Sequence, residues 1–172
     1  MVARSGSGRF AGRPVVTNWP PGTRPEQSQV FTHNEVAVPA CPQRVWQWLV
    51  NAGLWPRWYH NAWHVRLPDD RMSLEPDMVF QWTTLGARIT CKVVEYDPPS
   101  RIGWTWWRLG ASGYHCWLLT SDGTGTRVIT EETQRGFVPW LLRPTLQGVL
   151  SLAHWYWLRQ LARQATQRPP QP

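Results

Sequence analysis

Lysine is almost absent from this chain of 172 residues, although its net charge is +7. Of its 18 basic residues 17 are Arg, and Lys92 is the exception. A basic chain can bind nucleic acid or an anionic membrane when its cations cluster on one surface. Here the cations are scattered along the sequence, and the near-exclusive use of Arg indicates a compositional bias. We therefore predict no nucleic-acid partner.

Cysteine and long apolar runs are also scarce. Cys41, Cys91 and Cys116 show no metal-ligand spacing, which favours free thiols in a reducing compartment. Residues 1–28 lack the apolar stretch of a signal peptide. The most apolar window, 137–158, is interrupted by polar residues and falls short of the ~18 apolar residues of a membrane span. We expect a cytoplasmic protein without a transmembrane segment.

Tryptophan, in contrast, is abundant, with 14 residues in a chain of single-domain length. Each indole buries a large area and carries one N–H group that requires a partner. A dense core of this size has little room for so many indoles. The composition therefore predicts that several of them line a cavity, a groove or an interface.

The chain begins and ends with segments that are unlike its middle. Residues 1–28 contain four prolines and predict a flexible or surface-lying arm, and 167–172 predict a tail. Between them, 29–166 form the predicted domain. It starts with a strand at 29–38, a short helix from Pro42 and a helical turn at 54–59.

From Ala62 the apolar pattern alternates with a period of two, which predicts strands. Short turns separate these strands, so consecutive strands pair in antiparallel fashion. The last element is a helix that Pro144 and Thr145 start, and its apolar face over about 146–165 has a spacing of three and four residues. The pattern predicts an α+β domain in which a bent sheet grips this helix. The predicted strands are Ala62–Leu67, Met78–Thr84, Ala87–Tyr96, Arg101–Arg108, Gly113–Thr120 and Thr126–Arg135.

Five segments carry a resemblance to a known superfamily. They are Val-Pro-Ala-Cys-Pro-Gln-Arg-Val-Trp (38–46), Leu-Trp-Pro-Arg-Trp-Tyr (54–59), Val-Val-Glu-Tyr-Asp-Pro-Pro-Ser-Arg-Ile-Gly-Trp (93–104), His-Cys-Trp-Leu-Leu (115–119) and Gly-Thr-Arg-Val-Ile-Thr-Glu-Glu-Thr (125–133). Over residues 29–165 the chain resembles the SRPBCC or START-like superfamily, within it the polyketide cyclase/dehydrase-like and lipid-transport-like proteins.

The resemblance implies a helix-grip fold. In this fold a curved antiparallel sheet of about seven strands wraps around a long C-terminal helix, with two short helices after strand 1. It also implies a deep cavity for hydrophobic ligands between sheet and helix. The scaffold carries binders, carriers and enzymes, so the resemblance does not assign an activity.

Strand parity predicts which side chains face this cavity, because residues two apart share a face. On 126–135 the parity places Glu132 and Gln134 inside and Ile129 outside. For any single indole, packing in the core is the alternative to lining a ligand site. The predicted wall consists of Trp58, Phe80, Trp82, Ile89, Val93, Trp104, Trp106, His115, Trp117, Thr130, Glu132, His154 and Trp157.

His115, Glu132 and His154 are the polar members of this wall. A buried Glu needs a donor, which His115 could supply across the ladder and His154 from the helix. His115 and Glu132 are the candidate catalytic residues, because such a pair can exchange a proton near neutral pH. The alternatives are a structural pair or a solvent-facing Glu132. The trio could also hold a metal, but no local ligand spacing supports this, so we predict neither metal nor cofactor.

Three functions fit these patterns. The leading prediction is binding of a hydrophobic small molecule such as a lipid, a quinone or a polyketide-like aromatic. The second is a polyketide cyclase or dehydratase that uses His115 and Glu132 as acid and base. The third is a protein- or membrane-interaction module with an exposed apolar patch at 137–142. Ligand identity, turnover and oligomeric state are specified by none of these patterns.

Overall fold

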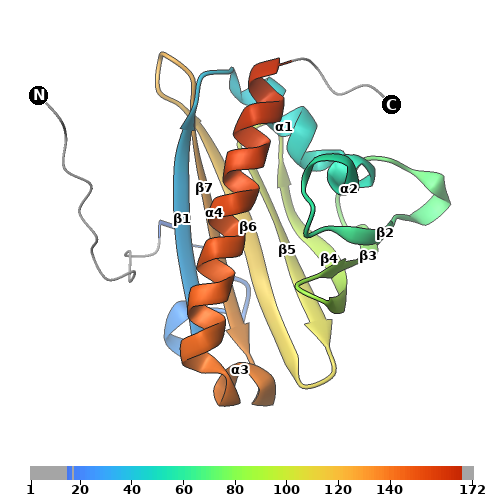
Figure 1. The fold of residues 1–172 in the computed structure, drawn as a ribbon, viewed down its shortest axis with the longest axis vertical. Helices are drawn as coiled ribbons and strands as arrows, with labels where there is room; N and C mark the ends of the chain where they lie inside the picture. The colour runs from blue at the N-terminus through green and yellow to red at the C-terminus, as the bar shows by residue number, and fades with distance from the viewer. Residues whose placement is uncertain (1–14, 17, 168–172) are drawn as a thin grey trace, which may run out of the picture.

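Seven antiparallel strands form one sheet, and the long helix α4 lies across one of its faces (Figure 1). The computed structural model describes residues 15, 16 and 18–167. The strand order is β1-β7-β6-β5-β4-β3-β2, so only β1 lies beside a strand distant in sequence. This arrangement confirms the predicted helix-grip architecture. The strands are β1 Val30–Val38, β2 Trp63–Arg66, β3 Val79–Thr84, β4 Ala87–Asp97, β5 Arg101–Arg108, β6 Ala111–Ser121 and β7 Thr126–Arg135.

Two short helices, α1 (Pro42–Val50) and α2 (Trp55–Trp58), follow β1 as predicted. Pro42 is the first residue of α1, where its missing N–H is not needed. The 3₁₀ turns are η1 (Pro25–Gln27), η2 (Ala52–Leu54) and η3 (Pro68–Asp70). No described helix is long and apolar enough to span a membrane.

The C-terminal part departs from the prediction at its start. Helix α4 covers Arg143–Gln167 and begins one residue before Pro144, the predicted start, which lies in its first turn. A further helix, α3 (Phe137–Leu141), was not predicted. Its five residues include Pro139, and they are too few to show a helical period.

The hairpin between β5 and β6 is also tighter than predicted. Strand β6 begins at Ala111, so the turn consists of Leu109 and Gly110. Gly110 has φ +78°, a left-handed conformation that glycine adopts without steric cost. The two extra residues extend β6 to the edge of the cavity described below.

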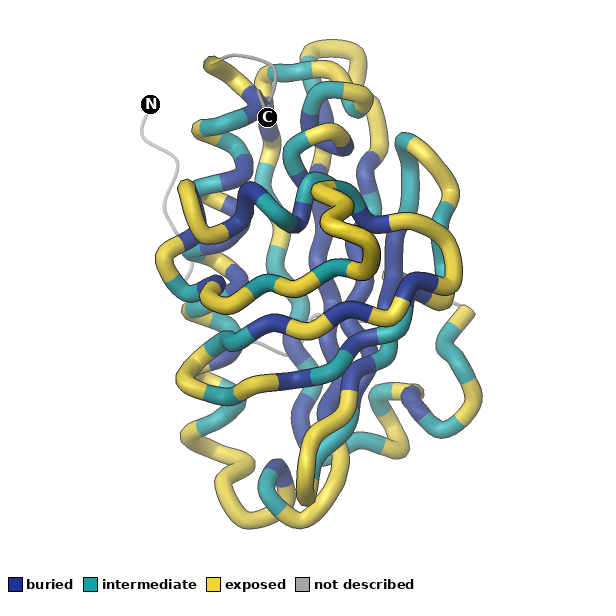
Figure 2. The backbone as a smooth tube through the Cα atoms, turned by 90° about the vertical axis from the view of Figure 1, so that its right-hand side faces the viewer, coloured by how far each residue is buried: buried dark blue, intermediate teal, exposed yellow. Residues whose placement is uncertain are grey.

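The core between α4 and the sheet is built from aromatic rings. The ring centroid of Trp55 lies 5.2 Å from that of Trp82 and 5.1 Å from that of Trp157, both in edge-to-face geometry. The buried indole N–H groups of Trp104 and Trp106 have no hydrogen-bond acceptor among the described residues. The faces of neighbouring rings are weak alternative partners in such packing. Figure 2 shows the central strands as mostly buried and the connecting turns as exposed.

The opposite face of β6 and β7 is covered by the chain before η1. Val16 and Trp19 pack against Tyr114 and Cys116, and the hydroxyl of Thr133 donates to the carbonyl oxygen of Thr23 at 2.8 Å. Ile129, expected to point outward, does lie on this face, but only 4% of it is exposed. Within the predicted arm, 1–14 and 17 lie outside the described residues.

Candidate functional site

A cavity of about 250 Å³ lies between α4 and the inner face of the sheet. Its wall is mainly aromatic and aliphatic. His115, Glu132, Gln134 and His154 form a polar cluster on β6, β7 and α4, and Thr84 of β3 and Arg108 of β5 line the cavity elsewhere. The aromatic lining residues are Tyr59, Trp82, Trp104, Trp106 and Trp157.

The structure places eight of the predicted wall residues around this cavity. They are Trp82, Ile89, Trp104, Trp106, His115, Glu132, His154 and Trp157. The other five, Trp58, Phe80, Val93, Trp117 and Thr130, do not line it. All five are buried, and two of them pack against other rings of the core. Trp55, for example, lies 6.2 Å from Phe80, and Trp157 lies 5.0 Å from Trp117, between ring centroids.

Tyr59 is a cavity residue that the sequence did not predict. Its ring stacks on that of Trp157 at 4.6 Å with an interplanar angle of 9°. It follows directly after the four-residue helix α2. A segment this short has no period from which an inward face could be inferred.

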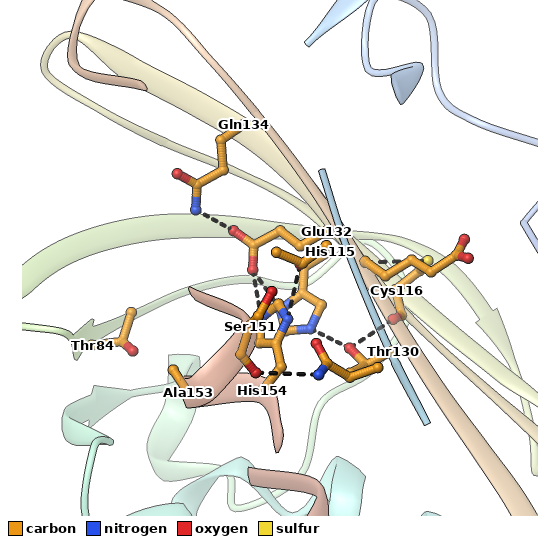
Figure 3. Close-up of polar contacts among 12 residues, drawn as sticks. Thr84, His115, Cys116, Thr130, Glu132, Gln134, Ser151, Ala153 and His154 are labelled. Atoms are coloured by element: carbon orange, nitrogen blue, oxygen red, sulfur yellow. Dashed lines mark hydrogen bonds and ion pairs between the residues drawn. The ribbon is translucent and has the colours of Figure 1, made fainter. Parts of the chain in front are cut away.

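The residues of the polar cluster converge on Glu132 (Figure 3). The strand register places His115 of β6 directly opposite Glu132 of β7, and α4 brings in His154 from the other side. His154 Nε2 lies 3.0 Å and His115 Nδ1 lies 3.4 Å from Glu132 Oε2. Gln134 donates through Nε2 to the other carboxylate oxygen, Oε1, at 2.7 Å. All four side chains are buried.

Each histidine contacts a threonine hydroxyl through its second ring nitrogen. His115 Nε2 lies 2.7 Å from Thr130 Oγ1, and His154 Nδ1 lies 3.1 Å from Thr32 Oγ1. Thr130 Oγ1 also lies 3.2 Å from the carbonyl oxygen of Cys116. The hydroxyl of Thr130 thus lies between His115 Nε2 and a backbone carbonyl, and the tautomer of the ring decides which group donates to which.

Burial lowers the pKa of His115 well below its usual value, and the nearby charge of His154 lowers it further. His115 is therefore neutral near pH 7. Its Nδ1 points toward the Glu132 carboxylate. The two imidazole rings stack at 4.6 Å with an interplanar angle of 28°, so both offer a nitrogen to the same oxygen.

A second buried glutamate, Glu131, lies on the outer face of β7 and outside the cavity. Its carboxylate accepts hydrogen bonds from the backbone N–H groups of Val15 at 2.7 Å and Val16 at 3.0 Å. His33 Nδ1 lies 2.8 Å from the same carboxylate. This hydrogen bond raises the pKa of His33 against the opposing effect of partial burial.

Comparison with known proteins gives one family and a set of structural neighbours. The family described as polyketide cyclase / dehydrase and lipid transport matches residues 30–166. No curated protein matches the chain. A hypothetical protein of Helicobacter pylori, jhp0584, superposes with a TM-score of 0.81 at 24% identity, covering 90% of this chain and 98% of that one.

Two further neighbours are aromatase/cyclases. The Zhui aromatase/cyclase from Streptomyces sp. R1128 gives a TM-score of 0.69 at 14% identity, covering 80% of this chain and 94% of that one. The di-domain aromatase/cyclase StfQ of the steffimycin biosynthetic pathway gives 0.68 at 18% identity, covering 81% and 52%. At these identities the likeness establishes the shared fold.

Proposed function

Because this chain belongs to the polyketide cyclase/dehydrase and lipid transport family, we propose that it binds a hydrophobic small molecule in the cavity under α4. The observation that carries the proposal is a largely aromatic wall with one buried polar cluster, made of His115, Glu132, Gln134 and His154. Small-molecule sites combine a mostly apolar lining with a few placed polar groups in this way. A lipid, a quinone or a polyketide-like aromatic fits this description.

The cavity volume narrows the ligand class. At about 250 Å³ the cavity is slightly below the range of roughly 300–1,000 Å³ for drug-sized ligands. This volume favours a compact ring system or a single acyl chain over a two-chain lipid. Burial of the ligand's apolar surface, at about 25 cal/mol per Å², supplies the affinity. His115, Glu132 and Gln134 orient a ligand carbonyl or hydroxyl at the polar cluster.

Native mass spectrometry of the purified protein, combined with tryptophan-fluorescence titration by a quinone and a fatty acid, tests this function. We expect one bound molecule per chain and a change in indole emission. Ala153 lines the cavity, so the larger side chain of Ala153→Phe fills part of the cavity. The matched control is Ala37→Phe on the exposed side of β1. Binding lost only in Ala153→Phe supports the cavity site; no ligand, or equal binding by both variants, refutes it.

A cyclase or dehydratase activity is the second candidate, favoured by the contact between His115 and Glu132 in the cavity wall. In this case the pair acts as base and acid on a bound polyketide. His115→Gln and Glu132→Gln then abolish turnover of a polyketide substrate while folding and ligand affinity are retained. Unchanged turnover in both variants excludes the pair.

Membrane docking is the third candidate, favoured by the exposed apolar surface beside the cavity. Phe137 is 65% and Trp140 63% exposed on α3, while Val138, Pro139 and Leu142 line the cavity. The sequence from 133 to 167 contains no acidic residue, which suits an anionic bilayer. Flotation with anionic vesicles tests this: Trp140→Ala weakens binding and Trp63→Ala, an equally apolar control on β2, does not. Equal flotation of both variants contradicts it.

A further inference from the structure

We propose that His115, Glu132 and His154 bind a divalent transition-metal ion whose open coordination position faces the cavity. This inference goes beyond ligand binding and departs from the prediction of no metal made on sequence spacing. The three residues come from β6, β7 and α4 and are far apart in sequence. Only the fold brings them together, so the absence of a local motif is no argument against the site.

The separations of the ligand atoms fit a single ion. His115 Nδ1 and His154 Nε2 lie 3.4 Å and 3.0 Å from Glu132 Oε2, and all three ligand atoms lie within 4.8 Å of one another. Tetrahedral ligands about 2.0–2.1 Å from zinc are separated by roughly 3.3 Å. Small side-chain adjustments therefore suffice to coordinate an ion.

The three ligand atoms also approach one another in a buried site. His115 Nδ1 and His154 Nε2 both point to the same carboxylate oxygen, and their rings stack at 4.6 Å between centroids. A buried carboxylate needs a positive or hydrogen-bonding partner. A metal ion between these atoms would bond to both imidazole nitrogens and to Glu132 Oε2.

The surrounding residues resemble the outer shell of a metal site. Metal-bound histidines usually donate their second ring N–H to an oxygen, which fixes ring orientation and tautomer. Thr130 Oγ1 lies 2.7 Å from His115 Nε2, and Thr32 Oγ1 lies 3.1 Å from His154 Nδ1. Gln134 holds the second oxygen of Glu132 at 2.7 Å. Each ligand is thus oriented by one buried polar partner.

Two imidazoles and one carboxylate favour zinc or a similar first-row ion, with three protein ligands and one free position. All three residues line the cavity, so the free position is open to it. One carboxylate leaves the bound ion with a net positive charge, which favours an anionic oxygen as the fourth ligand. This last step rests on the proposed function: the hydrophobic ligand would carry an enolate, phenolate or carboxylate.

The test is titration of chelator-treated protein with Zn²⁺ by calorimetry, and with Co²⁺ by the visible absorption of tetrahedral cobalt, both without hydrophobic ligand. We expect one ion per chain. Glu132→Gln and His154→Gln lower the affinity at least about 100-fold, and Thr130→Val lowers it about 10-fold. His33→Gln is the matched control, because His33 contacts the other buried glutamate on the outer face of the sheet. Its affinity stays that of the wild type.

The wild-type titration alone can overturn the proposal, so it does not depend on every variant folding. No binding of Zn²⁺ or Co²⁺ at about 100 µM refutes the site. So does equal affinity in wild type and folded Glu132→Gln, with folding checked by circular dichroism. If no metal binds but a hydrophobic molecule does, the proposed function stands and the metal site fails. If metal binds and no hydrophobic ligand does, the metal site stands and the proposed function fails.

Discussion

Two adjacent residues of β7, Glu131 and Glu132, place buried carboxylates on opposite faces of the same sheet. Glu131 accepts hydrogen bonds from two backbone N–H groups and contacts His33. Glu132 accepts one amide N–H, contacts two histidines and faces a cavity. The partners of Glu131 lie outside the cavity, whereas Gln134, His115 and His154, the partners of Glu132, line it.

This difference separates a structural carboxylate from a candidate functional one. Glu131 fixes the segment around Val15 and Val16 to the outer face, where no cavity lining residue lies. Glu132 faces the cavity and contacts two imidazole nitrogens, so a metal or a ligand group could bind beside it. Burial alone therefore does not identify a site; the remaining bonding capacity of the buried group does.

The largest expected effect is that of Glu131→Ala. It leaves the backbone N–H groups of Val15 and Val16 and the ring of His33 without their acceptor, and removing one partner of a buried charged pair costs about 3–5 kcal/mol. Urea unfolding measures this loss. A cost similar to that of an exposed substitution, within about 0.5 kcal/mol, would mean that the outer carboxylate is not structural.

Trp19→Ala is expected to be next in size. Trp19 packs edge-to-face on Tyr114 at 5.5 Å between ring centroids, and its indole N–H donates to the carbonyl oxygen of Val16 at 2.7 Å. Because Trp19 is only partly buried, we expect a loss of about 2 kcal/mol in the free energy of unfolding. Ligand and metal affinities should remain unchanged. A parallel loss of binding would show that the two faces of the sheet are coupled.

Glu132→Gln is expected to have the opposite effects, a small loss of stability and a large loss of metal affinity. The amide keeps the volume of the side chain and an oxygen that accepts from His154, so the stability loss should not exceed about 1 kcal/mol. Metal affinity falls strongly at the same time. Calorimetric titration and urea unfolding on the same preparation compare the two effects. A stability loss as large as that of Glu131→Ala would make Glu132 structural as well.

The smallest expected effect is the contribution of His33 to the pH dependence of the free energy of unfolding. Its pKa is raised by the hydrogen bond with Glu131, and Glu35 contributes in the same direction while Arg127 opposes it. Because the pKa of His33 is higher in the folded than in the unfolded state, its protonation stabilises the folded protein fully at pH values below the unfolded-state pKa of about 6.5. This stabilisation is lost as the pH rises through the folded-state pKa. We expect a decrease of about 1 kcal/mol or less from this group.

Urea unfolding at a series of pH values above about 6 measures this slope, and His33→Gln should abolish it. The same slope in wild type and variant would assign the pH dependence to another group. A stability that increases over this pH range would contradict the raised pKa of His33.

The sheet, α1 and the body of α4 were predictable because each has a strong local period. The period of two along β5 placed Trp104 and Trp106 inside and Trp107 outside, and the structure shows Trp107 46% exposed. The ends were less predictable. Helix α3 is too short to show a period, and the first residue of α4 depends on how Pro144 is accommodated.

The site was only partly predictable, since parity identifies a face and not the contacts above it. Parity assigned Trp117 and Glu132 to the same inner face, but the ring of Trp157 packs against Trp117 while Glu132 reaches the cavity. Nothing in the sequence predicted the role of Glu131. Its donors Val15 and Val16 lie in a segment without periodicity, and only the folded chain brings them to β7.

The central claim is that the space beneath α4 holds a hydrophobic molecule whose polar end lies at Glu132. The most direct measurement is a crystal structure of the protein with the molecule that co-purifies with it, identified by mass. The account predicts density against Trp104 and Trp157, with an oxygen toward Glu132 and His154. A well-resolved structure with an empty cavity, or with the ligand bound on the outer face near Tyr114, would contradict it.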